Sequence, residues 1–329
     1  MTSVSPWFDV DSKPTVGGLA VTDLSAVFGG VLWVGIVLTG SLSQIERALT
    51  LAPLVLVPLG LRMIAVPPFS GRTGWLYTTA VVLQPVGAVC VLWSFLVSTA
   101  SIAAGLSTVW LIVCGVLAGV GLQRTVDRGS IAPLSETVID AGLAYIVVGA
   151  VALMLHHLGI SFWFDPVIIL LTAVHFHYAG FVLPVMAGLT GRTVDSPNKI
   201  YQVVTSVILI GPAIIAVGIS FSALIEFLAV SVYTLTVTVF GGYVIVRVAP
   251  NRQRLQGTFL VASALALPVS MALALAYVSM LFVGFDPISI NIPRMVQLHG
   301  TLNAFGFGLV GLVGWRVEPP CQGEPSATV

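Results

Sequence analysis

Residues 164–190 read FDPVIILLTAVHFHYAGFVLPVMAGLT, and this stretch decides the fold class of the chain. From Pro166 to Thr190 it contains no Asp, Glu, Lys or Arg. An apolar stretch of this length is long enough to cross the hydrocarbon core of a bilayer as a helix. Asp165 can cap that helix and Pro166 suits its first turn, so we expect the helix to begin here.

The whole chain has the composition of a membrane protein. Of its 329 residues, 57% are hydrophobic and 8% are charged, whereas soluble domains carry about 25% charged residues. Similar apolar stretches recur along the chain, and they are too long and uniformly apolar for barrel strands. We therefore predict an all-α, polytopic membrane protein with about ten transmembrane helices. The expected spans are 18–39, 48–66, 75–97, 100–122, 136–157, 164–190, 200–220, 223–247, 256–283 and 295–316.

The basic residues are distributed unequally between the two sides of these spans. Only Arg47 and Arg294 fall on one side, and Arg62 lies inside the second span. Basic loops stay cytoplasmic during insertion, which predicts cytoplasmic termini and a multi-pass protein of the cell membrane. The basic residues on the predicted cytoplasmic side are Lys13, Arg72, Arg124, Arg128, Arg192, Lys199, Arg247, Arg252, Arg254 and Arg316.

The same pattern predicts the domain organisation. We expect a polar cytoplasmic N-terminus over 1–17, a single transmembrane domain over 18–316 and a disordered cytoplasmic tail over 317–329. The formal net charge of zero gives no basis for a nucleic-acid partner. The expected partners are the lipid bilayer and a small-molecule ligand or substrate.

Two of the five histidines lie in the opening stretch. His175 is about 13 Å along the helix from its start, which places it near the centre of the bilayer. His175 and His177 point about 200° apart around the helix axis, so one atom cannot bind both. His175 shares its side with Tyr178, and His177 shares its side with a row of small residues that favours close helix packing. We expect His175 to face a polar cavity and His177 to pack between helices.

The last span carries a second histidine site. His299 and Asn303 are four residues apart and lie on one helix face. The predicted orientation places His175 and His299 in the outer half of the membrane, together with His156 and His157. A shared depth favours convergence of these histidines, although His156 and His157 also suit the negative end of a helix dipole.

The second span contains two prolines, Pro53 and Pro58. They free backbone carbonyls in mid-helix, which are tolerated in a membrane where they line a cavity or meet a partner. Glu46 precedes them and could pair with an arginine or orient a histidine. The other polar candidates inside the spans are Gln84, Asp140, Gln202 and Glu226, and we interpret the two acids as helix-end residues.

Three motifs carry a resemblance to a known family. They are LAPLVLVPLG at 51–60, AVHFHYAGF at 173–181 and HGTLNAFG at 299–306. The chain resembles the YndJ-like family of bacterial and archaeal membrane proteins in these motifs. The resemblance implies a multi-spanning protein, sometimes described as a transporter, and it assigns no catalytic residue.

A second resemblance is local. His175-Phe176-His177-Tyr178 is similar to the His-x-His pair of the heme-copper oxidase catalytic subunit, whose histidines bind two hemes from opposite sides of one helix. His156-His157 is similar to that family's copper-binding pair, and His299-Gly300 to another heme-binding histidine. The order along the chain differs and the His-Pro-Glu segment is absent. This resemblance implies heme or copper, with His175, His177 and His299 as ligands.

The sequence leaves three functions open. The first is binding or transport of a small molecule at His175, His177, Tyr178, His299, Asn303, Glu46, Pro53 and Pro58. The second is a membrane oxidoreductase that uses the histidines as heme or metal ligands. The third is an isomerase or cyclase that acts on a lipid or isoprenoid by acid–base chemistry. Whether the protein is an enzyme is left undecided, because the chain lacks the usual nucleotide-binding, zinc-protease and hydrolase motifs.

Overall fold

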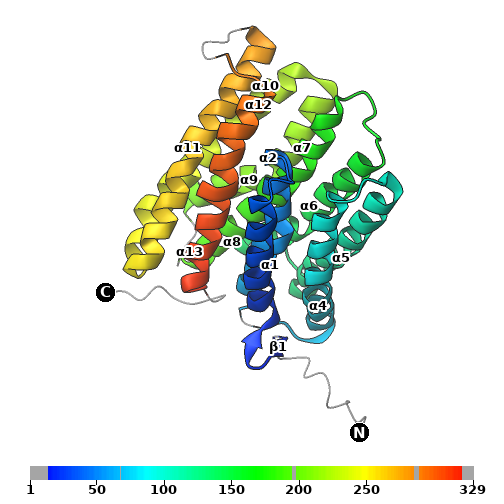
Figure 1. Cartoon of the computed structure of the whole chain (residues 1–329). Coiled ribbons are helices and arrows are strands. Elements are labelled where there is room, and N and C mark those ends of the chain that lie inside the picture. The colour runs from blue at the N-terminus through cyan, green and yellow to red at the C-terminus, as the bar shows by residue number, and fades with distance from the viewer. Residues whose placement is uncertain (1–13, 67, 195–197, 285–288, 321–329) are drawn as a thin grey trace.

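The computed structural model describes residues 14–66, 68–194, 198–284 and 289–320. In these residues, ten helical segments are long and apolar enough to cross a membrane, which confirms the predicted all-α, multi-spanning fold. They are Val21–Leu38, Gln44–Ile64, Gly71–Ser94, Ala100–Arg128, Leu134–His157, Pro166–Arg192, Lys199–Phe221, Ala223–Asn251, Arg254–Val283 and Ile292–Val317. The first strand and the end of the last helix lie at the same end of the bundle (Figure 1).

Six of the spans are single α-helices, and four contain π-helical turns. The unbroken spans are α1 (Val21–Leu38), α4 (Gly71–Ser94), α5 (Ala100–Arg128), α6 (Leu134–His157), α9 (Lys199–Phe221) and α11 (Arg254–Val283). The second span consists of α2 (Gln44–Leu51), η1 (Ala52–Leu56) and α3 (Val57–Ile64), and the sixth of α7 (Pro166–His177), η2 (Tyr178–Val182) and α8 (Leu183–Arg192). The eighth span consists of α10 (Ala223–Tyr243), η3 (Val244–Val248) and the 3₁₀ turn η4 (Ala249–Asn251). The tenth span consists of α12 (Ile292–Met295), η5 (Val296–Gly300), η6 (Leu302–Leu309) and α13 (Val310–Val317).

The predicted span ends differ from the observed ones by a few residues, and two of these differences have a clear structural cause. The fourth span was expected to end at residue 122, but α5 continues to Arg128 because Arg124 and Arg128 are paired with acids of α6. The first span was expected from residue 18, but two short strands, β1 (Thr15–Val16) and β2 (Leu19–Ala20), precede α1. Gly17 and Gly18 join them with positive φ angles, as a tight hairpin turn requires. Residues 1–13 and 321–329 of the predicted polar termini lie outside the described residues.

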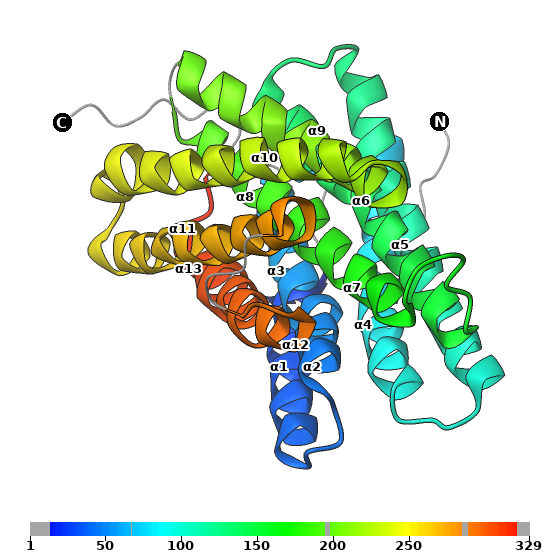
Figure 2. The same ribbon diagram turned by 90° about the horizontal axis from the view of Figure 1, so that it is seen from above.

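The second span is the most enclosed of the ten. Within its most apolar window, 89% of the residues are buried. Figure 2 shows α3 and α8 in the middle of the bundle, with the long helices around them. Lipid tails would accept the apolar side chains of the second span equally well, so its central position is better explained by its backbone, whose freed carbonyls need protein donors.

The prolines of this span leave backbone carbonyls without helical donors. Neither Pro53 nor Pro58 has an N–H group, and the N–H of Val57 reaches back five residues to Ala52 O. The Pro53 carbonyl is therefore free, and Gln84 Nε2 of α4 donates to it at 2.6 Å.

A second carbonyl is satisfied from the sixth span. The N–H of Ala52 donates to Leu49 O, three residues back, so Ala48 O has no donor from that residue. The hydroxyl of Tyr178 donates to Ala48 O at 2.8 Å. These two bonds confirm that the freed carbonyls of the second span meet partners, and they tie it to α4 and η2.

The first helix also reaches this backbone directly. A Cβ placed on Gly29 of α1 would lie 2.0 Å from Leu54 O. Real Cβ atoms do not approach a carbonyl oxygen so closely, so this position requires glycine. Gly35, further along the same helix, has no heavy atom within 4 Å of such a Cβ.

We predict that Gly29→Ala destabilises the protein, because α1 must move away from η1 to make room for the methyl group. Overpacking of this kind costs about 1–3 kcal/mol or more. The midpoint of thermal unfolding in detergent should fall for Gly29→Ala and stay unchanged or rise for the matched control Gly35→Ala. Equal midpoints for the two variants would contradict the packing of α1 on the broken span.

Candidate functional site

The sixth span begins as the sequence predicts. The Asp165 side chain accepts a hydrogen bond from the N–H of Val167, and Pro166 occupies the first helical position. The helix then widens into the π-turn η2, which begins directly after His177 and ends two residues before Pro184. The second span has the same arrangement, with Pro58 two residues after η1. Such π-turns inside membrane helices are frequent at functional sites.

His177 packs between helices, as predicted. Its side chain is fully buried, its Nδ1 donates to Ala173 O at 2.7 Å, and Trp110 Nε1 of α5 donates to its Nε2 at 2.9 Å. A Cβ on Gly149 of α6 would lie 2.7 Å from His177 Nδ1, so only glycine lets α6 pass this close. Both ring nitrogens are occupied, and His177 therefore has a structural role.

His175 points the opposite way and is exposed. Its Nδ1 donates to Leu171 O at 2.7 Å, which leaves Nε2 as a hydrogen-bond acceptor. Nε2 has no hydrogen-bond partner among the residues that the structure describes. An exposed imidazole near the middle of an apolar span needs a cavity, since lipid tails offer it no hydrogen bonds.

His299 lies opposite His175 and is held by a closed network. The ring centroids of His175 and His299 are 6.3 Å apart, with an angle of 28° between the ring planes. His299 Nδ1 donates to Ser270 O at 2.7 Å, and Asn303 Nδ2 lies 3.1 Å from His299 Nε2. Ser270 Oγ donates to Asn303 Oδ1 at 3.0 Å, so α11 fixes both side chains.

His175, His299 and Asn303 line a cavity of about 640 Å³. Its lining residues come mainly from α2, α6, α7, α9, α10, α11, α12 and the π-turns η2, η5 and η6. In Figure 1 the labels of α2, α7 and α12 lie toward the end of the bundle away from β1. A volume in this range suits a small-molecule ligand. The lining includes four of the sequence-predicted residues, His175, Tyr178, His299 and Asn303. Sequence reasoning therefore identified residues on two facing sides of the cavity.

The other predicted site residues do not line this cavity. Glu46 forms a capping box at the start of α2, where it accepts from the N–H of Ser43 at 2.6 Å. Pro53 and Pro58 are buried in the second span and act through the carbonyls they free. His177 faces Trp110, on the far side of its helix from His175.

His156 and His157 are also separate from the cavity lining. His157 Nε2 lies 2.9 Å from Ser94 Oγ, and its ring packs on Phe95 at a centroid distance of 5.0 Å. The two histidines end α6, as the helix-dipole interpretation expects. A shared depth in the membrane did not bring them to His175.

The three histidines expected as metal or heme ligands do not meet. His175 and His299 are neighbours, but both ring nitrogens of His177 are bound on the opposite side of the helix. The π-turn that could have rotated one toward the other begins only at Tyr178. In the described part of the chain, no group of three or more His, Cys, Asp or Glu side chains could hold a metal ion. A group bound by both His175 and His299 would have to displace Asn303 from His299.

Sequence reasoning missed two tyrosines of the cavity wall. Tyr233 of α10 lines it, is 5% exposed, and its hydroxyl has no hydrogen-bond partner in the described residues. Tyr277 of α11 lines it as well. No sequence signal identifies them, because their role depends on how α10 and α11 pack against α7.

Glu226, one of the polar candidates from the sequence, lies in the first turn of α10, as the interpretation of a helix-end acid expects. It also lines the cavity, which the sequence did not predict.

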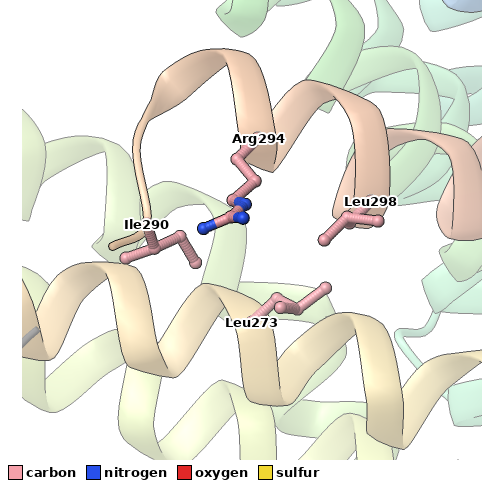
Figure 3. Close-up of a pocket in the computed structure, with 4 residues that line it drawn as sticks. All are labelled: Leu273, Ile290, Arg294 and Leu298. Carbon is pink, nitrogen blue, oxygen red and sulfur yellow. The ribbon is translucent and has the colours of Figure 1, made fainter. Parts of the chain in front are cut away.

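A smaller cavity of about 380 Å³ lies beside α12. Figure 3 shows its four labelled side chains, Leu273, Ile290, Arg294 and Leu298. Arg294 NH1 donates to Ser289 O at 3.2 Å, and Glu46, which was considered as a partner for Arg294, is used in its capping box. None of the four residues lines the larger cavity.

The half of the bundle near β1 contains a buried ion-pair network. Glu136 is fully buried and is bound by Arg124 and by Arg192, whose Nε lies 2.7 Å from Glu136 Oε1. Asp140 is bound by Arg124 and Arg128, each at 2.7 Å. Arg192 also donates to carbonyls at the end of α3. Sequence reasoning missed Glu136 because acids commonly occur in the first turn of a helix, where the helix dipole favours them.

Comparison with known proteins gives a family but no activity. Residues 47–307 match the sequence model of the family described as YndJ-like protein. A protein of Bacillus subtilis (strain 168), described as "Uncharacterized membrane protein YndJ", is 37% identical over 188 residues. This alignment covers 56% of the chain and 33% of the relative, so the matched part is about a third of the relative's length. No solved structure gives a significant match.

We predict that Trp110→Phe destabilises the protein, because His177 Nε2 loses its only donor and stays buried. An unsatisfied buried acceptor costs about 1–3 kcal/mol. The midpoint of thermal unfolding in detergent should fall for Trp110→Phe. The control Trp75→Phe changes a tryptophan that is 62% exposed and should leave the midpoint unchanged. A Trp110→Phe variant as stable as the control would contradict the structural role of His177.

Proposed function

This chain belongs to the YndJ-like family of membrane proteins, and we propose that it binds a small, largely apolar molecule in the cavity beside His175 and carries it through the membrane. The observation that carries the proposal is the exposed His175 ring in a cavity of about 640 Å³, deep in a span that is otherwise apolar. Most of the lining is aliphatic or aromatic, with a few polar groups among them, as is usual for ligand sites.

The two proline-broken spans support the transport part of the proposal. Interrupted membrane helices next to a central site are common in secondary transporters. Here η1 and η2 belong to neighbouring spans, which Tyr178 connects through Ala48 O. The cavity lies toward one end of the bundle, and the ion pairs of Glu136 and Asp140 lie toward the other end. This arrangement matches a carrier that is closed toward the side of its termini.

We further propose that the termini are cytoplasmic and that the protein resides in the cell membrane, with the cavity in the outer half of the bilayer. The support is the excess of basic residues at the end of the bundle that holds β1 and the end of α13. A chain fused after its last residue to green fluorescent protein should fluoresce in bacterial cells. The same fusion to alkaline phosphatase, which is active only outside the cytoplasm, should be inactive. The opposite pair of results would reverse the orientation.

We predict that a small molecule remains bound to the protein when it is purified in lipid nanodiscs. Extraction and mass spectrometry should find it with the wild type and with His156→Ala, which changes a histidine outside the cavity. His175→Ala should retain at least tenfold less, because the acceptor at Nε2 is lost. All three proteins should elute as folded particles in size-exclusion chromatography. An identical profile of bound molecules in the two variants would contradict a site at His175.

A further inference from the structure

The charges around the cavity define what it can hold. Among the described residues that line it, Glu226 is the only carboxylate, and there is no arginine or lysine. The nearby Arg294 lines the smaller cavity and not this one. An anionic ligand, such as a fatty acid or a phosphorylated isoprenoid, would find no cation to neutralise it. A cavity with one acid and no base favours a ligand that carries positive charge.

Glu226 is available to such a ligand. It lies in the first turn of α10, where Ser222 caps the helix through the N–H of Ile225. The Glu226 carboxylate makes no hydrogen bond or ion pair with any residue in the described ranges, and its side chain is partly exposed. An unpaired carboxylate inside a membrane-spanning segment is costly, so acids in such places are typically paired or functional. A cationic ligand would supply the missing partner.

A second polar group of the cavity fits the same ligand. His175 Nε2 is a free acceptor because Nδ1 carries the proton that is donated to Leu171 O. A ligand that carries an N–H or O–H donor on its body matches this acceptor better than a ligand that offers only acceptors.

The apolar part of the cavity wall indicates that the rest of the ligand is apolar. It includes Leu155, Ile168, Phe176, Leu267 and Leu281, which come from the three helices α6, α7 and α11. Burial of an alkyl or ring system against such a wall provides most of the binding free energy. We infer that the ligand is a hydrophobic amine, whose ammonium group pairs with Glu226 and whose apolar body fills the cavity. This inference rests on the proposed binding function and adds the chemical class of the ligand.

Three unbranched probes of twelve carbons each test this inference. Dodecylamine is protonated at pH 7, dodecan-1-ol is neutral and dodecanoate is anionic, so they differ mainly in the charge of the head group. Binding of each is measured by titration calorimetry to the protein in phosphatidylcholine nanodiscs, with empty nanodiscs to subtract partition into lipid. We expect dodecylamine to bind the wild type at least tenfold more tightly than dodecan-1-ol, and dodecanoate to bind most weakly.

Variants of Glu226 identify the source of the preference. Glu226→Gln should lose the tenfold preference for the amine while its affinity for dodecan-1-ol stays within about twofold of the wild type, and Glu226→Asp should keep the preference. The matched control Glu46→Gln changes a glutamate outside the cavity to a residue that also suits a capping box, and it should bind like the wild type. Unchanged alcohol binding shows that the Glu226→Gln variant is folded.

The possible failures are distinguishable. If dodecanoate binds as tightly as dodecylamine, or if Glu226→Gln leaves the amine preference intact, the inference about the ligand class is overturned while the cavity remains a binding site. If none of the three probes binds above the empty nanodiscs, the inference about the ligand class is overturned, and the mass spectrometry of wild type and His175→Ala decides the proposed binding function.

Discussion

The structure depends on satisfying the backbone of one enclosed, proline-broken helix. Hydrocarbon offers no hydrogen bonds, so each carbonyl freed in the second span needs a protein donor. Side chains from several helices donate to carbonyls of this span: Trp33 to Arg47 O, Tyr178 to Ala48 O, Gln84 to Pro53 O, Tyr77 to Leu61 O and Arg192 to Ile64 O. The donors come from α1, α4, η2 and α8, so satisfying one backbone fixes the positions of four neighbouring elements.

The same constraint shapes the cavity. Tyr178 is the first residue of η2, and its hydroxyl is committed to Ala48 O, so its ring stays against the second span. His175, three residues earlier, is thereby held on the side of the helix that faces His299. On the opposite side, Trp110 and Gly149 hold His177 tightly against α5 and α6. The rigid contact on one side of the helix positions the exposed imidazole on the other.

The sequence predicts those features that depend on one helix at a time. Hydropathy located all ten spans, helical periodicity separated His175 from His177, and the lack of N–H groups in Pro53 and Pro58 predicted carbonyls in need of partners. It did not predict features that depend on which helices are neighbours. Hydropathy gives the depth of His156 in the membrane but not its lateral position, and nothing local to Tyr233 or Gly29 shows that one borders a cavity and the other a carbonyl.

The acidic side chains of the two halves of the bundle differ in their pairing, and this contrast favours a ligand. Near β1, Glu136 and Asp140 are surrounded by three arginines, which offset the cost of burying the acids. Around the larger cavity, the Glu226 carboxylate and His175 Nε2 have no partner among the described residues. Polar side chains within membrane-spanning segments are typically paired or functional. A molecule that binds in the cavity and provides a charge for Glu226 and a hydrogen bond for His175 accounts for both.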